Sequence, residues 1–293
     1  MIKRQLNLIL LTAVTVLTCS SCLQTGQPAS ASDETSDEAS GEVSSFFDTS
    51  AKKKNAKKTA TTATSPVSTG LVAGGKDGQM LRRTAYTTSY NRETRTANWV
   101  AWALTGEHTT GPYKRDGYKF HEDSDVPAPR ATNDDYFRSG YNRGHLCPSA
   151  DNKWSEKAQS ESFLFTNICP MNRNLDGGDW NDLEQACRRW AKRYEKLYIV
   201  CGPVYLDRDH RKLGKNKVVV PDQYFKVVMT FGKNGNSPKA LGFLYDNRSG
   251  RHQMSTYVHT VDDIERLTGF DFFPFLNDKL EAKVESHADL GEW

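Results

Sequence analysis

The sequence predicts a single mixed α+β domain over residues 76–293, behind a signal segment and a polar tether. In this region, segments of strand-like composition interleave with segments of helical periodicity, and several of the links are of turn length. The aromatic content of 11% indicates a chain that packs a core. Residues 23–75, by contrast, carry few large apolar side chains, so burial there cannot offset the entropy lost on ordering.

Residues 1–22 have the pattern of an export signal. Two basic residues precede a short apolar stretch, Leu6 to Leu17, which is too short for an ordinary membrane-spanning helix. Two serines stand directly before Cys22, as in the lipobox of bacterial lipoproteins, although Cys19 occupies the position where that motif usually has leucine. We therefore expect export to a bacterial cell envelope with a lipid anchor at Cys22, with plain secretion as the alternative.

The tether at 23–75 contains an acidic run followed by a lysine run at 52–58. Lysines in this arrangement can contact nucleic acid or anionic lipid, but a solvated linker is the simpler interpretation. The whole chain has a net charge of only +3, so its overall charge does not indicate a nucleic-acid partner. Any polyanion site must therefore be local.

Strands and helices are predicted from composition and period. Strand-like segments, rich in aromatic and β-branched residues, fall at 84–91, 97–105, 163–170, 196–205, 224–231 and 239–246. Residues 106–139 are polar and rich in Gly, Pro, Asp and Arg, which predicts a long irregular excursion.

Two helices are predicted, the first beginning near Asp179. Asp179 is a suitable N-cap, and Thr260 with Gly269 predicts the start and stop of the second helix. The first helix has one apolar face, made of Trp180, Leu183, Cys187, Trp190, Ala191, Tyr194 and Leu197.

Four cysteines follow the tether, namely Cys147, Cys169, Cys187 and Cys201. They form no CxxC pair, so a zinc site is not expected. Cys187 lies on the predicted helix and Cys201 on the strand after it, and a short connection brings these two elements together. We therefore predict a Cys187–Cys201 disulfide, with two buried free thiols as the alternative.

The stretch "GYNRGHLCPSAD" (140–151) carries the first candidate site residues. Hydrolysis of a phosphodiester needs a base for water, a cation for the developing oxyanion and donors that hold the phosphate. His145 can be the base because its ordinary pKa of about 6.5 leaves it mostly neutral at pH 7. Arg143 can hold a phosphate oxygen, and Gly144 permits close backbone approach.

Candidate metal ligands follow in "TNICPMNRNLDGGDWNDLEQ" (166–185). Mg²⁺ prefers oxygen ligands and needs only one or two from the protein. Asp176 lies just before the predicted helix and Glu184 within it, while three asparagines (Asn167, Asn172 and Asn174) come upstream. Each of the Asp and Asn residues is also a common turn or cap residue, so the pattern alone leaves both interpretations open.

Taken together, "YNRGHLCPSAD" and "FTNICPMNRNLDGGDWNDLE" resemble the DNA/RNA non-specific endonucleases, the group that includes mitochondrial endonuclease G. That family's signature is Asp-Arg-Gly-His, then a Ser/Thr-Asn-x-x-Pro-Gln segment, then Leu-Asn-x-Gly-x-Trp-x-x-Leu-Glu. The segments "ANWVAW", "YIVCGPVY" and "VDDIERLTGFDFF" also resemble family segments, in the family's order. The likeness covers about residues 84–275.

The resemblance implies a ββα-metal (His-Me finger) nuclease core within a mixed β-sheet domain. It also implies one Mg²⁺ or Mn²⁺ and cleavage of DNA and RNA, single- or double-stranded, to 5′-phosphate ends. Carried over by position, it makes His145 the general base, Arg143 a phosphate contact, Asn167 a support of the site, Glu184 the residue that orients metal-bound water, and Asp176 the metal ligand. A further arginine that stabilises the pentacovalent phosphate should come from residues 111–130, and Arg115 is the candidate.

This chain departs from the family pattern at three positions. Asn142 replaces the first Asp of the motif, Met171 replaces Gln, and Asp176 stands where Asn is usual. These changes keep open a catalytically impaired nucleic-acid-binding module, and a phosphodiesterase acting on another substrate is a second alternative. If Asp176 does not bind the metal, Asn174 is the next candidate. The sequence does not assign an oligomeric state, and a homodimer is one alternative.

Overall fold

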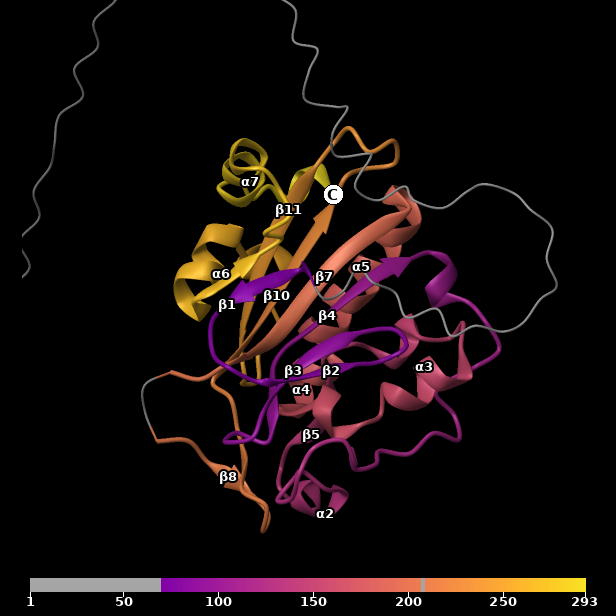
Figure 1. Cartoon of the computed structure of the whole chain (residues 1–293), viewed down its shortest axis with the longest axis vertical. Coiled ribbons are helices and arrows are strands. Elements are labelled where there is room, and N and C mark those ends of the chain that lie inside the picture. The colour runs from indigo at the N-terminus through magenta and orange to yellow at the C-terminus, as the bar shows by residue number, and fades with distance from the viewer. Residues whose placement is uncertain (1–69, 207–208) are drawn as a thin grey trace, which may run out of the picture. The chain divides into compact units, whose positions relative to one another are not determined.

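The computed structural model describes residues 70–206 and 209–293 (Figure 1). The predicted signal segment and most of the predicted tether lie outside these residues. The first described strand, β1 (Val72–Gly74), begins four residues before the domain boundary expected at 76, and it pairs with β13 (Phe270–Phe272). No helix among the described residues combines the length and the apolar character needed to cross a bilayer.

A seven-stranded antiparallel sheet forms the centre of the domain, which confirms the predicted α+β class. Its strand order is β12-β11-β10-β7-β4-β3-β2. The strands are β2 (Gln79–Arg82), β3 (Thr87–Asn91), β4 (Thr96–Thr105), β7 (Lys196–Val204), β10 (Gln223–Thr230), β11 (Lys239–Asp246) and β12 (Val258–His259). The smaller elements are α2 (Asn133–Tyr136), β5 (Asn142–His145), α3 (Glu156–Glu161), β6 (Ile168–Met171), α4 (Arg173–Gly177), β8 (Lys212–Leu213) and β9 (Val218–Val219).

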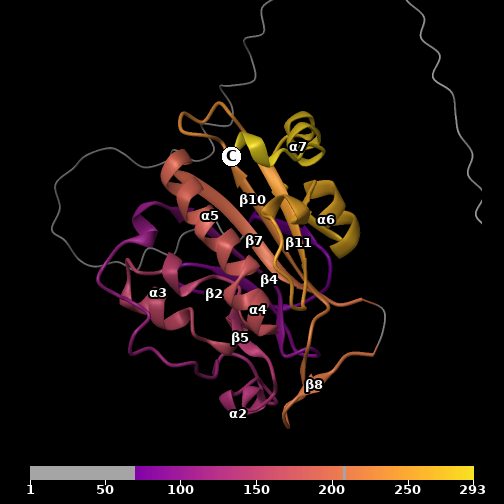
Figure 2. The same ribbon diagram turned by 180° about the vertical axis from the view of Figure 1, so that it is seen from behind.

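Helices cover both faces of this sheet (Figures 1 and 2). The long helix α5 (Asp179–Tyr194) packs on β4 and β7, whereas α6 (Val261–Thr268) and α7 (Asp278–Glu285) pack on β11. Successive residues of β7 point to opposite faces, so Ile199 joins the core under α5 and Val200 joins the core under α6. The sheet therefore separates two hydrophobic cores.

The α5 helix has the predicted buried face, but its start differs from the prediction. Gly178 is the N-cap, and Asp179 is the first helical residue. The Asp179 carboxylate accepts hydrogen bonds from the Tyr257 hydroxyl (2.5 Å) and the His252 backbone N–H (3.3 Å), so it is committed to a tertiary contact instead of capping. The helix ends at Tyr194, and the last residue of the predicted stripe, Leu197, belongs to β7.

The second predicted helix is confirmed as α6. The Thr260 side chain accepts the Asp263 N–H, and Asp263 in turn accepts the Thr260 N–H, which makes a capping box. Gly269 ends the helix with a φ of 73°, a left-handed conformation that glycine adopts without steric cost.

The predicted strand at 163–170 is only partly present. A 3-10 turn occupies Phe165–Asn167, and β6 begins at Ile168. From this turn the buried Asn167 side chain reaches backbone groups of Cys147 and Ser162. A continuous strand would not present Asn167 in this way, which accounts for the difference.

The expected Cys187–Cys201 disulfide is wrong, and the free-thiol alternative is confirmed. All four cysteines of the domain are buried and free. The Cys201 thiol donates a hydrogen bond to the Leu146 carbonyl (3.3 Å). Burial raises the pKa of both Cys187 and Cys201 to about 12, so these thiols behave as small apolar core side chains.

Candidate active site

A β-hairpin followed by a helix positions the candidate residues. Strand β5 pairs antiparallel with β6, so that Gly144 lies opposite Cys169 and His145 opposite Ile168. A Cβ at Gly144 would lie 2.6 Å from the Met171 Cβ, so only glycine lets the two strands pair this closely. Helices α4 and α5 follow β6 directly, which completes the ββα arrangement.

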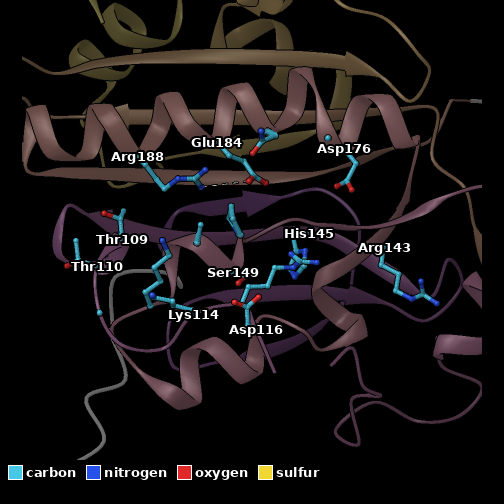
Figure 3. Close-up of a pocket in the computed structure, with 17 residues that line it drawn as sticks. Thr109, Thr110, Lys114, Asp116, Arg143, His145, Ser149, Asp176, Glu184 and Arg188 are labelled. Atoms are coloured by element: carbon cyan, nitrogen blue, oxygen red, sulfur yellow. Dashed lines mark ion pairs between the residues drawn. The ribbon is translucent and has the colours of Figure 1, made fainter. Parts of the chain in front are cut away.

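These elements border a cleft of about 670 Å³. His145, Arg143, Arg115, Asp176 and Glu184 all line it, and Figure 3 shows His145 between the segment that carries Asp116 and the α5 helix. The ionisable lining residues other than His145 are five cations (Lys114, Arg115, Arg143, Lys153 and Arg188) and three acids (Asp116, Asp176 and Glu184). The positive lining suits a polyanionic ligand, even though the chain as a whole is nearly neutral.

His145 is held in an aromatic corner. Its ring lies edge-to-face on Phe163 (centroids 5.1 Å apart) and tilted against Phe120 (5.3 Å), and the residue is 7% exposed. Burial, with a smaller contribution from the Arg115 charge, lowers the pKa of His145 to about 3. Its Nε2 has no hydrogen-bond partner among the described residues. The imidazole is therefore neutral at pH 7, with a ring nitrogen left over for a ligand.

Two arginines lie over the same aromatic rings. The Arg115 guanidinium lies 5.4 Å from the Phe163 ring centroid and 5.9 Å from that of Phe120, and Arg143 lies 5.7 Å from Phe120. Arg143 also donates a hydrogen bond to the Asn133 carbonyl (3.1 Å). These contacts hold the two guanidinium groups on the wall of the cleft that contains His145.

Asp176 and Asn142 contact each other, so two of the three departures from the family pattern form one pair. The Asn142 amide donates to Asp176 Oδ2 (2.8 Å), and no described residue donates a hydrogen bond to Oδ1. Burial raises the pKa of Asp176, against the opposing effects of the Asn142 hydrogen bond and the Arg115 charge. Asn142 thus orients the carboxylate, and one oxygen remains available.

Glu184 lies on α5, and its side chain is 13% exposed. Burial raises the pKa of Glu184 to about 7, and the positive charges of Lys226 and Arg188 oppose this rise. Arg188 lies 3.8 Å from Glu184 and 3.1 Å from the buried carboxylate of Asp151. Near neutral pH, Glu184 therefore exchanges easily between its charged and neutral forms.

Asn167 and Asn174 do not line the cleft. Asn167 is fully buried; its Oδ1 accepts the Cys147 N–H (2.9 Å), and its Nδ2 donates to the carbonyls of Cys147 (2.9 Å) and Ser162 (2.8 Å). It therefore holds the turn that follows His145. The Asn174 amide donates to the Ser249 hydroxyl (3.1 Å), away from the cleft.

Several residues that line or adjoin the cleft were not predicted from the sequence. Asn181 and Arg188 line the cleft beside Glu184. Asn181 comes three residues before Glu184 and Arg188 four residues after it, a spacing that puts these polar side chains on one face of the helix, just as the apolar residues share another face. Lys226 is 1% exposed, and its ammonium lies 4.1 Å from the Trp180 ring centroid. Its position as the single lysine of the apolar segment "YFKVVMTF" is the sequence signal that could have identified it. No sequence pattern marks Phe120 and Phe163 as the aromatic corner.

The donor atoms of the cleft suit a hard divalent cation. Asp176 offers an oxygen without a hydrogen-bond donor, and Glu184 and Asn181 add further oxygens nearby. Carboxylate and carbonyl oxygens are the ligands that Mg²⁺ and Mn²⁺ accept, and Mg²⁺ needs only one or two of them from the protein. Asp176, on α4, would therefore hold the ion, with Glu184 on the following helix, α5.

Comparison with known proteins agrees with this geometry. The chain is 35% identical over 202 residues to the mitochondrial nuclease EXOG of Xenopus laevis, a match covering 64% of this chain and 56% of that protein. It is 32% identical to the mitochondrial endonuclease G of Bos taurus, covering 71% of this chain and 77% of the relative. The chain thus spans less than two thirds of the length of the EXOG relative.

A solved structure and a family model extend the comparison. A chain from the crystal structure of an EndoG/EndoGI complex superposes with a TM-score of 0.67 at 27% identity, covering 71% of this chain and 90% of that one. The family model of the DNA/RNA non-specific endonucleases matches residues 66–279, which confirms the resemblance found in the sequence. Because that model spans most of the chain and the fold matches that of the solved structure, the protein belongs to the DNA/RNA non-specific endonuclease family.

Proposed function

We propose that this protein is a Mg²⁺-dependent endonuclease that hydrolyses phosphodiester bonds of DNA and RNA without sequence preference and leaves 5′-phosphate ends. The observation that carries the proposal is the unpartnered Nε2 of the neutral, buried His145, in a cationic cleft that also holds Asp176 and Glu184. A buried histidine with a purely structural role would have both ring nitrogens satisfied.

Each residue has a role that follows from its position. His145 Nε2 accepts the proton of the attacking water, because the neutral ring has a free lone pair there. Arg143 and Arg115 bind the phosphate oxygens from the aromatic wall. Glu184 orients the water, and the Asn142 amide keeps one Asp176 oxygen toward the ion. A bound Mg²⁺ supplies Lewis-acid stabilisation of the charge that develops on the phosphate.

The test is degradation of supercoiled plasmid DNA and of a structured RNA by the purified protein, with Mg²⁺ and with EDTA. We expect cleavage of both with Mg²⁺ only, and ligatable 5′-phosphate ends. His145→Ala should lose about 10²–10⁴-fold in rate while its thermal unfolding midpoint stays close to that of the wild type. His287→Ala, a histidine with a side chain 60% exposed, is the matched control and should keep full activity.

Three outcomes would contradict the proposal. Near-normal turnover by His145→Ala would remove the histidine base. DNA binding without any cleavage would favour a nucleic-acid-binding module that has lost catalysis. Inert DNA and RNA alongside turnover of a small phosphodiester would point to another substrate.

The place of the protein in the cell is a further part of this proposal. Residues 1–22 support export, and Cys22 supports a lipid anchor. Cys22→Ser should release the protein from the membrane fraction without changing its nuclease rate. If labelled fatty acid does not attach to the wild-type protein, plain secretion replaces the anchor.

A further inference from the structure

An acidic cluster lies on the α6/α7 side of the sheet, away from α5. Asp262 and Glu265 are three residues apart on α6, and Glu285 is the last residue of α7. One carboxylate oxygen from each residue lies within 4.8 Å of one from each of the others. The cluster therefore joins two helices that are separate in the chain.

Among the described residues, this cluster has no ion-pair partner. Across residues 70–206 and 209–293, no lysine, arginine or histidine forms an ion pair with any of the three carboxylates. The nearest arginine in sequence, Arg266, is paired with Asp263 instead (2.6 Å). Two further acids, Glu281 and Asp271, add to the negative charge that acts on Glu285.

Glu285 is the member that needs a partner. It is 2% exposed, and its Oε1 is buried without a hydrogen bond. Burying a carboxylate is costly unless it is paired, hydrogen-bonded or bound to a metal. Glu265 cannot rearrange freely to relieve the contact, because its Oε1 accepts the Phe272 backbone N–H (2.7 Å).

We infer that Asp262, Glu265 and Glu285 bind one Ca²⁺ ion, which ties α6 to α7 and is separate from the catalytic cleft. Oxygens on opposite sides of a Ca²⁺ ion are about 4.6–5.2 Å apart, so one ion can reach ligands within the 4.8 Å limit. Ca²⁺ accepts several carboxylates in flexible geometry, whereas Mg²⁺ keeps most of its waters and takes one or two. Three converging carboxylates therefore favour Ca²⁺.

The site acts on stability and not on the reaction. The ion replaces repulsion among three carboxylates by attraction to a common charge, and it does so only in the folded state, where the two helices meet. Binding to the folded state alone raises the unfolding midpoint as the ion concentration increases. The cleavage rate should not depend on it.

The test uses the full chain, stripped with EDTA and desalted, and measures Tm and calorimetric binding with CaCl₂ alone and with MgCl₂ alone. These measurements are made on the Asp176→Ala variant, so that metal binding in the cleft does not contribute to them. At Ca²⁺ about 100-fold above its Kd we expect Tm to rise by roughly 5–10 °C, with one site per chain and a smaller rise for Mg²⁺.

Variants locate the effect. Glu285→Gln should abolish the Ca²⁺-dependent rise, and Asp262→Asn, at the half-buried edge of the cluster, should do the same should Glu285→Gln not fold. Glu281→Gln removes a charge from the same helix outside the cluster and should keep most of the rise. The inference is overturned if Ca²⁺ leaves the Tm of the Asp176→Ala protein unchanged, if Glu285→Gln and Asp262→Asn respond like their parent, or if Mg²⁺ stabilises as much as Ca²⁺.

Discussion

The two sides of the sheet each bury a glutamate, and the two glutamates have opposite surroundings. Glu184, under the cleft, lies near the charges of Lys226 and Arg188, and burial raises its pKa only to about 7. For Glu285, on the α6/α7 side, burial and the neighbouring acids Glu265, Glu281, Asp262 and Asp271 together raise the pKa to about 9. Burial acts in the same direction in both places, so the difference comes from the neighbouring charges.

This contrast shows how the protein separates the needs of a reactive site from those of a scaffold. The cleft holds acids among cations, so its carboxylates stay usable near neutral pH while the lining remains positive. On the opposite side, the cluster of Asp262, Glu265 and Glu285 has no ion-pair partner among the described residues, and a bound proton or metal ion would relieve its repulsion.

After the loss of the His145 base, the next largest effect is expected from the Asp176 carboxylate on the cleft side. Asp176→Ala removes the oxygen that Asn142 orients and should reduce activity on the order of 10–100-fold at limiting Mg²⁺. Asp176→Asn keeps an oxygen without the charge and should stay active with a higher Mg²⁺ requirement. Magnesium titrations of the rate measure both effects, and unshifted curves would remove Asp176 from the metal site.

Removing the buried cation of the cleft side should change its pH dependence. Without the charge of Lys226, the pKa of Glu184 should rise further above 7, so Lys226→Met should move the acid limb of kcat/KM to higher pH. A rise of one unit in this pKa lowers kcat/KM about tenfold on the acid limb and changes it little at higher pH. Lys239→Met, a sheet lysine beside Tyr194 and Trp293, should leave the profile unchanged. A uniform loss at every pH would mean that Lys226 serves only packing.

On the opposite side, neutralising Glu285 should stabilise the metal-free protein. Its folded pKa of about 9 exceeds the unfolded value of about 4.3, so the folded state binds more protons between these values and stability falls as pH rises across them. In EDTA, the free energy of unfolding of Glu285→Gln, measured by urea denaturation, should therefore exceed that of the wild type by about 1–2 kcal/mol at pH 9. The two proteins should have the same free energy of unfolding near pH 4. Equal or lower stability at pH 9 would show that the repulsion is relieved in another way.

The smallest effect concerns the four thiols, which lie in the core between the sheet and α5. Because they are buried and free, a thiol reagent should label none of the four in the native protein and all four after unfolding. Dithiothreitol should change Tm by less than about 1 °C. Peptide mapping would identify any position that reacts early, and a Cys187–Cys201 cross-link would overturn the free-thiol assignment.

Local patterns determined much of the architecture. The period of three to four residues predicted α5 and α6, and strand composition predicted the long sheet strands, because an apolar face must be buried whatever covers it. The boundaries were less well determined. Asp179 looked like a cap because capping depends on residue type, and only the approach of Tyr257 from 78 residues away recruited its carboxylate elsewhere.

For the site, the sequence alone predicted which residues would carry the chemistry: His145, Arg143, Asp176 and Glu184 are recognisable from residue type and motif order, and the structure places all four around one cleft. Only the tertiary structure decided their environment. It placed Phe163 and Arg115 on His145, put Lys226 beneath Glu184, and brought Glu285 against α6. The physical reason is that motifs report chemistry along the chain, whereas pKa, burial and metal sites depend on charges and surfaces that meet only when distant segments fold together.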